Sequence, residues 1–180
     1  SQSGINGVEW DAVELPSQFM ENWCWQPEAL ALISEHYETG AALPEQEIER
    51  LIRARHFQSA MGLLRQLEFG LFDLRLHLGR SNLSALDVWR QVRAEVAVTP
   101  TADFERFPNY FAHIFSGGYD AGYYSYLWAQ QLASDAFDAF HHSDIFSGEL
   151  GTRFRREILE RGSSRSAMAS YVAFRGREPE

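Results

Sequence analysis

Apolar residues recur every three or four positions along most of this chain, which is the spacing of one face of an α-helix. Between residues 8 and 25, Trp10, Val13, Phe19 and Trp23 roughly follow this spacing. The stretch from 57 to 78 is dense enough in Leu, Met and Phe for a largely buried helix. The pattern predicts helices over residues 8–25, 28–37, from 44 onward, 57–78, 84–98, 109–115, 119–140, 153–160 and 164–174.

Proline, glycine and serine mark where several of these helices begin and end. Pro16 lies inside the first segment, so a helix either begins near it or is kinked there. Ser84, followed three positions later by a carboxylate, resembles a capping box. Gly162 is expected to end one C-terminal helix and Ser164 to cap the next. With no internal repeat and no convincing strand pair, these signals predict an all-α fold in one domain over residues 1–180.

The composition indicates a globular protein with an acidic surface. Apolar residues make up 45% of the 180 residues and charged residues 23%. The chain has 16 basic and 25 acidic residues, and the resulting net charge of −9 argues against nucleic acid or an anionic membrane as partner. Aromatic residues reach 14%, which is generous for a core alone and suggests an aromatic cleft or interface.

Several classes of protein and site are excluded by the sequence. No run of about 18 apolar residues predicts a membrane span. The first seven residues lack the basic and apolar regions of a signal peptide. Cys24 is the only cysteine, which excludes an internal disulfide and a Cys-rich zinc site, and it is expected to be a buried thiol. We therefore expect a reducing, cytoplasmic environment, and any metal would need His and carboxylate ligands.

A stripe of polar residues, Asp11, Glu14, Gln18 and Glu21, is the first candidate for chemistry. Their spacing of 3, 4 and 3 places them on one face of a continuous helix. One interpretation is the solvated face of an ordinary amphipathic helix. The other is a metal site in which one carboxylate binds the ion and its neighbours orient it, because catalytic zinc sites often combine two His with a Glu from another helix.

A second candidate is the segment over residues 117–126, Gly-Gly-Tyr-Asp-Ala-Gly-Tyr-Tyr-Ser-Tyr. On a helix, Tyr119, Tyr123 and Tyr126 would share one face. Gly117 and Gly118, just before that helix, allow a ligand to approach the backbone closely. A tyrosine hydroxyl can donate a hydrogen bond to an oxyanion formed during acyl transfer. Aromatic packing in a core explains the same spacing, so both interpretations stay open here.

The six histidines include no metal-binding pair of a known pattern. No two of them lie four apart with Glu directly after the first, so an H-E-x-x-H motif is absent. His113 stands out because it precedes the Gly-Gly-Tyr segment and could reach the same cleft. The remaining five are interpreted as surface, core or helix-end residues: His36, His56, His77, His141 and His142.

Two long strings in the sequence resemble the M3 family of zinc metallopeptidases. Residues 7–23, GVEWDAVELPSQFMENW, resemble the segment that follows this family's zinc-binding helix. Residues 111–128, which include GGYDAGYYSYLW, are similar to its tyrosine-bearing segment, and residues 158–179 look like its C-terminal helices. The resemblance spans essentially the whole chain and is nearest to the oligopeptidase A-like members, which implies a helical part of a zincin-type catalytic domain.

This resemblance also implies a role for individual residues. The family hydrolyses short peptides with zinc that is held by the two His of H-E-x-x-H and a downstream Glu, and Glu14 matches that third ligand. Tyr119 and Tyr126 match the tyrosines that contact substrate and stabilise the tetrahedral oxyanion. The resemblance further implies a set of substrate-binding positions: His113, Tyr123, Gly117, Gly118 and Gly162.

The chain departs from the family pattern in two places. The H-E-x-x-H helix, which the family carries just before the segment matching Gly4 to Gly7, is absent. Ser163 replaces the second glycine of the family's Gly-Gly-Ser loop. We therefore expect Zn²⁺ only in the full-length enzyme, and the 180-residue chain is predicted to be inactive alone.

Two classes of function remain open at this point. The chain is either part of a zinc-dependent oligopeptidase acting on short peptides, with the N-terminal part of the same enzyme as its partner, or a non-enzymatic helical module that binds peptides or assembles with another protein. Exposed apolar surface could also drive self-association. Neither nucleic acid nor a membrane is expected as a partner.

Overall fold

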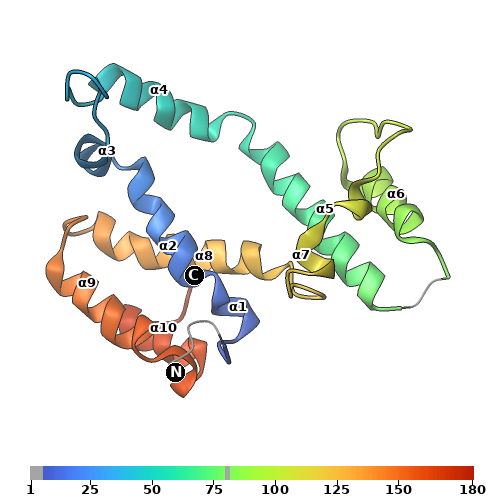
Figure 1. The fold of residues 1–180 in the computed structure, drawn as a ribbon. Coiled ribbons are helices and arrows are strands. Elements are labelled where there is room, and N and C mark those ends of the chain that lie inside the picture. Colours follow the sequence, from blue (N-terminus) through green and yellow to red (C-terminus); the bar gives the residue numbers. More distant parts are fainter. Residues whose placement is uncertain (1–5, 80–81) are drawn as a thin grey trace. The chain divides into compact units, whose positions relative to one another are not determined.

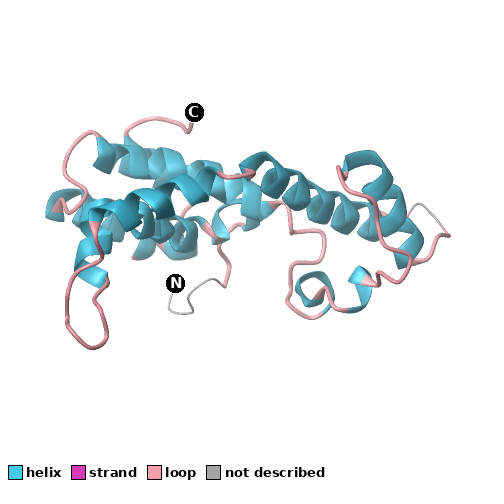
Figure 2. Ribbon diagram, turned by 90° about the horizontal axis from the view of Figure 1, so that it is seen from above, coloured by secondary structure: helices cyan, strands magenta, loops and turns pink. Residues whose placement is uncertain are grey.

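Helices and loops make up the protein in the computed structural model, which describes residues 6–79 and 82–180. Figure 2 shows no strand in these described ranges, where the one β-type pairing is an isolated bridge between Glu35 and Ala42. The predicted all-α class is confirmed.

The helices are labelled as in Figure 1. In chain order they are α1 (Trp10–Val13), α2 (Leu15–Glu21), the 3₁₀-helix η1 (Asn22–Trp25), α3 (Pro27–Ile33), α4 (Glu45–His56), α5 (Ser59–His77), α6 (Ala85–Val96), the 3₁₀-helix η2 (Phe107–Asn109), α7 (Ala112–Phe115), α8 (Ser125–His141), α9 (Gly148–Phe154), the π-helix η3 (Arg155–Leu159), the 3₁₀-helix η4 (Gly162–Ser164) and α10 (Ala167–Arg175).

Contacts divide the chain into two compact units. Unit 1 comprises residues 1–55 and 125–180, and unit 2 comprises residues 56–124. Within unit 1, α1 and α2 pack against α8, so segments far apart in the sequence lie side by side (Figure 1). Within unit 2, α5 packs against α6. The single domain expected from the sequence stays a prediction.

Phe19 on α2 lies at the centre of the core of unit 1. It is 2% exposed, and its ring stacks on Phe154 at a centroid distance of 3.9 Å. Trp23 meets the Phe19 ring edge-on at 5.0 Å and donates a hydrogen bond from Nε1 to the carbonyl of Ile145, at 2.8 Å. Full burial of one such side chain contributes about 1.5–3 kcal/mol, so this cluster joins the two sequence-distant parts of unit 1 firmly.

Unit 2 has its own aromatic core around Trp89 on α6. Trp89 and Phe72 are fully buried, and Phe107 stacks on Trp89 at 4.3 Å. The guanidinium of Arg65 lies 4.5 Å from the centre of the Phe69 ring and 5.1 Å from that of Trp89, which is a cation–π arrangement. Much of the aromatic surplus noted in the sequence is therefore used in packing.

Several predicted helix ends agree with the structure because the signals that set them are local. The side chain of Ser84 caps α6 by accepting a hydrogen bond from the backbone N–H of Asp87. Pro16 lies in the first turn of α2, so a helix does begin near it. Gly176 ends α10 with a left-handed φ of +79°.

Other predicted features are wrong. The segment over residues 119–124 forms turns, and α8 begins only at Ser125. Ser166, rather than Ser164, caps α10, since its side chain accepts from the N–H of Ala169. Gly148 begins α9, with Ser147 as its cap, so this helix starts before the predicted residue 153. Cys24 is exposed because its neighbour Trp23 takes the inward position on the short helix η1.

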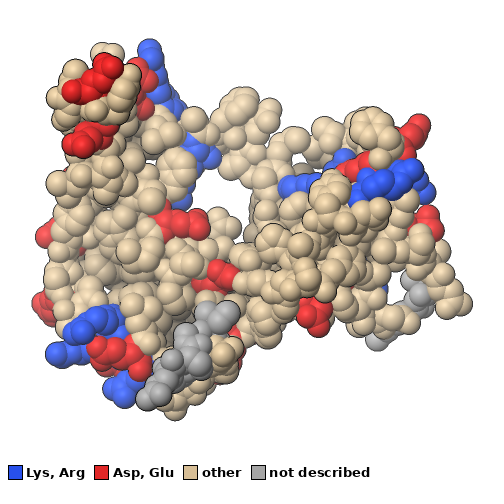
Figure 3. All heavy atoms as spheres, viewed as in Figure 1, with Lys and Arg blue, Asp and Glu red and all other residues tan. Residues whose placement is uncertain are grey.

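Acidic and basic side chains gather in mixed groups on the face that Figure 3 shows, over α4 and over α6. On α4, Arg50 pairs with Glu47 at 2.8 Å, and on α6, Arg90 pairs with Asp87 at 3.5 Å. Exposed pairs of this kind contribute only about 0–1 kcal/mol each. In the described ranges, none of the helices has both the length and the apolar character that a membrane crossing requires.

Candidate active site

Glu14 occupies the junction between α1 and α2. Its backbone has φ −91° and ψ 0°, so it belongs to neither helix. Pro16 follows in the first turn of α2, and the N–H of Gln18 donates to the carbonyl of Glu14 at 3.0 Å. The hydroxyl of Ser17 lies 2.6 Å from Oε2 of Glu14 and holds this half-buried carboxylate in one orientation. A carboxylate oriented in this way could serve as a ligand for a metal ion.

The break at Glu14 changes the interpretation of the polar stripe. Because α1 ends before Glu14, the four residues do not share the face of one continuous helix. Asp11 and Glu21 are exposed, whereas Gln18 is partly buried. Among the described residues, Oε1 of Gln18 is a buried atom without a hydrogen-bond partner. The face is therefore not a uniformly solvated one.

Tyr126 lies in the first turn of α8 and is partly buried. Both α1 and α2, which flank Glu14, pack against α8, which carries Tyr126, so unit 1 contains both residues. The next turn of α8 is anchored by Ala129, which is fully buried. A rigid helix is a precise support for a hydrogen-bond donor.

Unit 2 brings three of the predicted residues together. The ring of His113 lies 6.1 Å from that of Tyr119 and 5.8 Å from that of Tyr123, measured between centroids. Tyr123 is 8% exposed, and its hydroxyl donates to Oε1 of Gln66 at 3.2 Å. His113 itself is exposed and Tyr119 partly so. The unit therefore presents an imidazole and a phenol close together, with the second phenol beneath them.

Gly117 and Gly118 shape the turn that joins His113 to Tyr119. A Cβ on Gly117 would lie 2.8 Å from the carbonyl oxygen of His113, which is closer than real contacts allow. Gly118 has a φ of +81°, a conformation that L-residues rarely adopt. The N–H of Tyr119 then donates to the carbonyl of His113 at 3.0 Å. Both glycines are thus needed to bring Tyr119 back toward His113.

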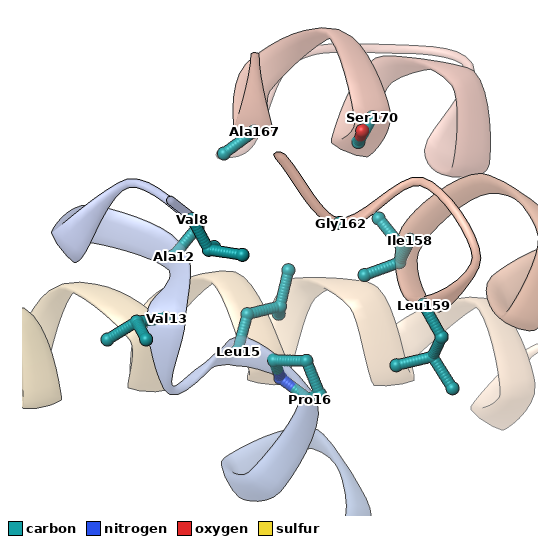
Figure 4. Close-up of a pocket in the computed structure, with 10 residues that line it drawn as sticks. All are labelled: Val8, Ala12, Val13, Leu15, Pro16, Ile158, Leu159, Gly162, Ala167 and Ser170. Atoms are coloured by element: carbon teal, nitrogen blue, oxygen red, sulfur yellow. The ribbon is translucent and has the colours of Figure 1, made fainter. Parts of the chain in front are cut away.

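Gly162 lines an apolar cavity of about 250 Å³ in unit 1. Figure 4 shows the loop at Gly162 between Ile158 and Ala167, facing Ala12 and Leu15 from α1 and α2. Gly162 has a φ of +49°. Neither Glu14 nor a tyrosine is among the residues that line this cavity. An apolar side chain is the kind of group that this cavity could accept.

The neighbouring Ser163 fits the loop in spite of its Cβ. Its Oγ would lie 3.0 Å from a Cβ placed on Gly7, whose φ is +79°. The glycine at position 7 therefore leaves room for the side chain of Ser163.

The described histidines and carboxylates do not complete a metal site. No group of three or more His, Cys, Asp or Glu side chains in residues 6–79 and 82–180 is arranged to hold an ion. His77 is paired with Asp73, at 2.8 Å between Nδ1 and Oδ1, and His142 with Asp138, at 3.2 Å. Glu14 could supply one ligand of the three that catalytic zinc usually takes from protein. The described residues of this chain therefore do not form a complete zinc site.

Asp73 is a residue that the sequence analysis missed. It lies on α5, is 0% exposed, and accepts hydrogen bonds from the backbone N–H groups of Ala121 and Tyr123, both at 2.9 Å. The sequence offers one weak signal, which is a carboxylate within an otherwise apolar stretch of a buried helix. No local pattern shows which backbone it contacts.

The chain as a whole matches a known protein family. The chain belongs to peptidase family M3, whose family model matches residues 1–180. The resemblance described from the sequence is thereby confirmed.

Several members of the family are similar to this chain over almost its whole length. The chain is 55% identical to oligopeptidase A of Escherichia coli (strain K12) over 181 residues, which cover 99% of this chain and 27% of that protein. It is 46% identical to the organellar oligopeptidase A of Arabidopsis thaliana, covering 98% of this chain and 23% of that protein. It is 37% identical to dipeptidyl carboxypeptidase of Escherichia coli, covering 99% and 27%. The chain thus spans about a quarter of the length of these relatives.

Proposed function

We propose that this chain supplies the third metal ligand and the oxyanion-binding and substrate-binding tyrosines of a zinc-dependent oligopeptidase that hydrolyses short peptides. The observation that carries the proposal is the match to the M3 family over residues 1–180, together with 55% identity to an oligopeptidase A. That match spans both the segment around Glu14 and the segment around Tyr119.

Glu14 is the proposed ligand, and Ser17 orients it. The hydrogen bond of 2.6 Å between Ser17 Oγ and Glu14 Oε2 fixes the orientation of the carboxylate that would bind the ion. Two further ligands have to come from residues outside this chain, in the H-E-x-x-H helix that the family resemblance implies. The N-terminal part of the same enzyme is therefore the proposed partner.

Tyr119 and Tyr126 are the proposed donors to the oxyanion of the tetrahedral intermediate. A neutral phenol suits this role because it donates a hydrogen bond without carrying a charge into the site. The proposed substrate-binding positions are His113, Tyr123, Gly117, Gly118 and Gly162. We propose the cytoplasm as the location, and neither nucleic acid nor a membrane as a partner.

The ligand role of Glu14 is tested in the intact protein, in which this chain follows an H-E-x-x-H helix. Glu14→Gln should lower kcat/KM for a short fluorogenic peptide by about 100-fold or more and weaken zinc binding measured by dialysis and metal analysis. Glu28→Gln, an exposed change on α3, is the matched control and should have wild-type activity and zinc content. Full zinc content in Glu14→Gln would rule out the ligand role.

The 180-residue chain alone is proposed to be inactive, because a single carboxylate binds zinc weakly. Chelator-sensitive turnover of a short peptide by the purified chain would contradict this proposal. The exposed Leu32 and Ile33, at 73% and 68%, are proposed to favour self-association of the isolated chain. A strict monomer in sedimentation at high concentration would contradict that part.

A further inference from the structure

Asp73 is a buried carboxylate that reaches across unit 2 to the backbone of the tyrosine-bearing segment. Its Oδ1 accepts from the N–H of Ala121 and its Oδ2 from the N–H of Tyr123, each at 2.9 Å. The side chain is 0% exposed. Burial of an ionised carboxylate is costly unless hydrogen bonds compensate it, so these backbone contacts are a condition for placing Asp73 here.

His77 completes the set of partners around Asp73. It lies one turn further along α5, and its Nδ1 is 2.8 Å from Oδ1 of Asp73 and 2.9 Å from the Asp73 carbonyl. Because the imidazole stands on the same helix, it keeps the carboxylate oriented toward Ala121 and Tyr123. The two oxygens of Asp73 thus accept from two backbone N–H groups, and Oδ1 also lies 2.8 Å from an imidazole nitrogen.

The backbone that Asp73 holds is strained. Ala121 has a φ of +57°, and in the described chain only one other residue besides glycine, Gln58, has a positive φ. A left-handed conformation is unfavourable for alanine, so an external contact has to maintain it. The N–H of Ala121 is the group that Asp73 binds, which identifies this carboxylate as that contact.

The same segment sets the position of Tyr119. The carbonyl of Tyr119 accepts from the N–H of Gly122 at 2.9 Å, and the N–H of Tyr119 donates to the backbone carbonyl of His113 at 3.0 Å. Gly122 stands between the two residues whose amides Asp73 binds. Release of those amides would therefore free the turn that begins at Tyr119.

We propose that Asp73 is a positioning residue for peptide hydrolysis, which holds the backbone of residues 119–123 so that Tyr119 is presented to the substrate in one conformation. This inference rests on the proposed peptidase function. In this role Asp73 does not touch the substrate. It acts through the amides of Ala121 and Tyr123.

Asp73→Asn in the intact protein tests the proposal. A carboxamide keeps one acceptor oxygen and turns an NH₂ group toward the second amide, so one of the two hydrogen bonds is lost at nearly constant volume. We expect kcat/KM to fall about tenfold or more, with the loss mainly in kcat. Hydrogen exchange at the amides of Ala121 and Tyr123 should become about tenfold faster.

A rescue experiment separates positioning from a general loss of stability. Ala121→Gly removes the cost of the left-handed backbone and, in the Asp73→Asn background, should restore activity about fivefold. Gln58→Gly is the matched control, because Gln58 has a similar φ of +54° and lies in unit 2 at the start of α5. It should restore less than about twofold, since it relieves strain elsewhere.

Three results would overturn the inference. The first is that Asp73→Asn has the kcat/KM and the amide exchange rates of the wild type. The second is that Ala121→Gly and Gln58→Gly restore the activity of Asp73→Asn equally. If Asp73→Asn fails to fold, amide hydrogen exchange in the wild-type protein tests the proposal instead. Ala121 is exposed in a turn, so its amide should be protected from exchange only if Asp73 binds it. Exchange at the rate of an open loop would be the third contrary result. A wild-type intact protein that cleaves no peptide would instead refute the proposed function, while amide exchange would still decide whether Asp73 holds the turn.

Discussion

The two units carry their candidate residues in different ways. In unit 1, Glu14 is oriented by residues within a few positions of it in the sequence, namely Pro16, Ser17 and Gln18. In unit 2, the turn from Tyr119 to Tyr123 is held by Asp73, which is 48 positions from Ala121 and 50 from Tyr123. Local contacts form whenever the helix forms, whereas the distant contact requires α5 to be packed. A change near Glu14 should therefore disturb one side chain, and a change around Tyr119 should disturb a whole turn.

Among the variants that test this comparison, Tyr126→Phe should have the largest effect on activity. Tyr126 stands on the rigid helix α8, so loss of its hydroxyl should remove a hydrogen bond and leave the backbone unchanged. We expect kcat for peptide hydrolysis by the intact protein to fall about 10²–10³-fold with little change in KM. Tyr37→Phe, at an 87% exposed tyrosine of unit 1, should have no effect. Unchanged kcat with a raised KM would show that Tyr126 binds substrate without stabilising the oxyanion.

Gly117→Ala should have the next largest effect. The new Cβ would meet the His113 carbonyl at 2.8 Å, so the backbone between His113 and Tyr119 has to move. Because a displacement of about 1 Å can cost about 100-fold in rate, we expect kcat/KM to fall about 10- to 100-fold. Gly62→Ala on α5 is the control, since nothing lies within 4 Å of its added Cβ and a helical alanine is favourable. Equal activity of the two variants would show that the turn is not rigid.

Ser17→Ala tests whether the Glu14 carboxylate is oriented by its neighbours in the sequence. The substitution removes the 2.6 Å hydrogen bond to the Glu14 carboxylate and leaves Pro16 and the helix start in place. We expect zinc affinity of the intact protein to fall about tenfold, which is the low end for loss of a group that orients a ligand. Ser134→Ala, at an exposed position of α8, should leave zinc affinity unchanged. A loss as large as that of Glu14→Gln would mean that Ser17 supports more than one carboxylate.

The smallest effect is expected on the stability of unit 1, from a change at Asp135, which is not one of the candidate site residues. Although burial alone would raise the pKa of Asp135, hydrogen bonds from Arg177, Tyr171 and Arg175 hold the pKa of that carboxyl below its ordinary value of 3.8. The arginine contacts are 2.5 Å for Arg177 and 3.2 Å for Arg175. The pKa of Tyr171 is raised, first by burial and then by its hydrogen bond to Asp135. The cluster joins the C-terminal residues to α8.

The sign of its pH dependence follows from these shifts. A lowered pKa in the folded state contributes stability that is present above pH 3.8 and is lost as the pH falls through the folded pKa. The raised pKa of Tyr171 contributes stability below pH 10 that is lost as the pH rises further. We expect Asp135→Asn to lower the free energy of unfolding by about 1–3 kcal/mol near pH 7, with the difference from wild type shrinking in strong acid. Asp138→Asn, at a 46% exposed side chain 3.4 Å from Arg175, should cost less, and a difference that is constant with pH would contradict the role of the Asp135 carboxylate.

The sequence alone determined the all-α class and many of the helix ends. Helical periodicity, the Ser84 cap, the position of Pro16 and the glycine after α10 all act over a few residues, so they are visible without a structure. Where competing local signals stood close together, the prediction failed, as with Ser164 and Ser166 before α10. The residues proposed for zinc and substrate came from the family resemblance, and the match to family M3 supports the resemblance as a whole.

Only the tertiary structure decided the conformation of the tyrosine-bearing segment. Tyr119, Tyr123 and Tyr126 have helical spacing, yet residues 119–124 form turns. The reason is physical: the amides of Ala121 and Tyr123 are directed to the buried carboxylate of Asp73, whereas a helix would direct them to preceding carbonyls. Such a contact links residues on two separate elements, and it therefore leaves no periodic trace in the sequence.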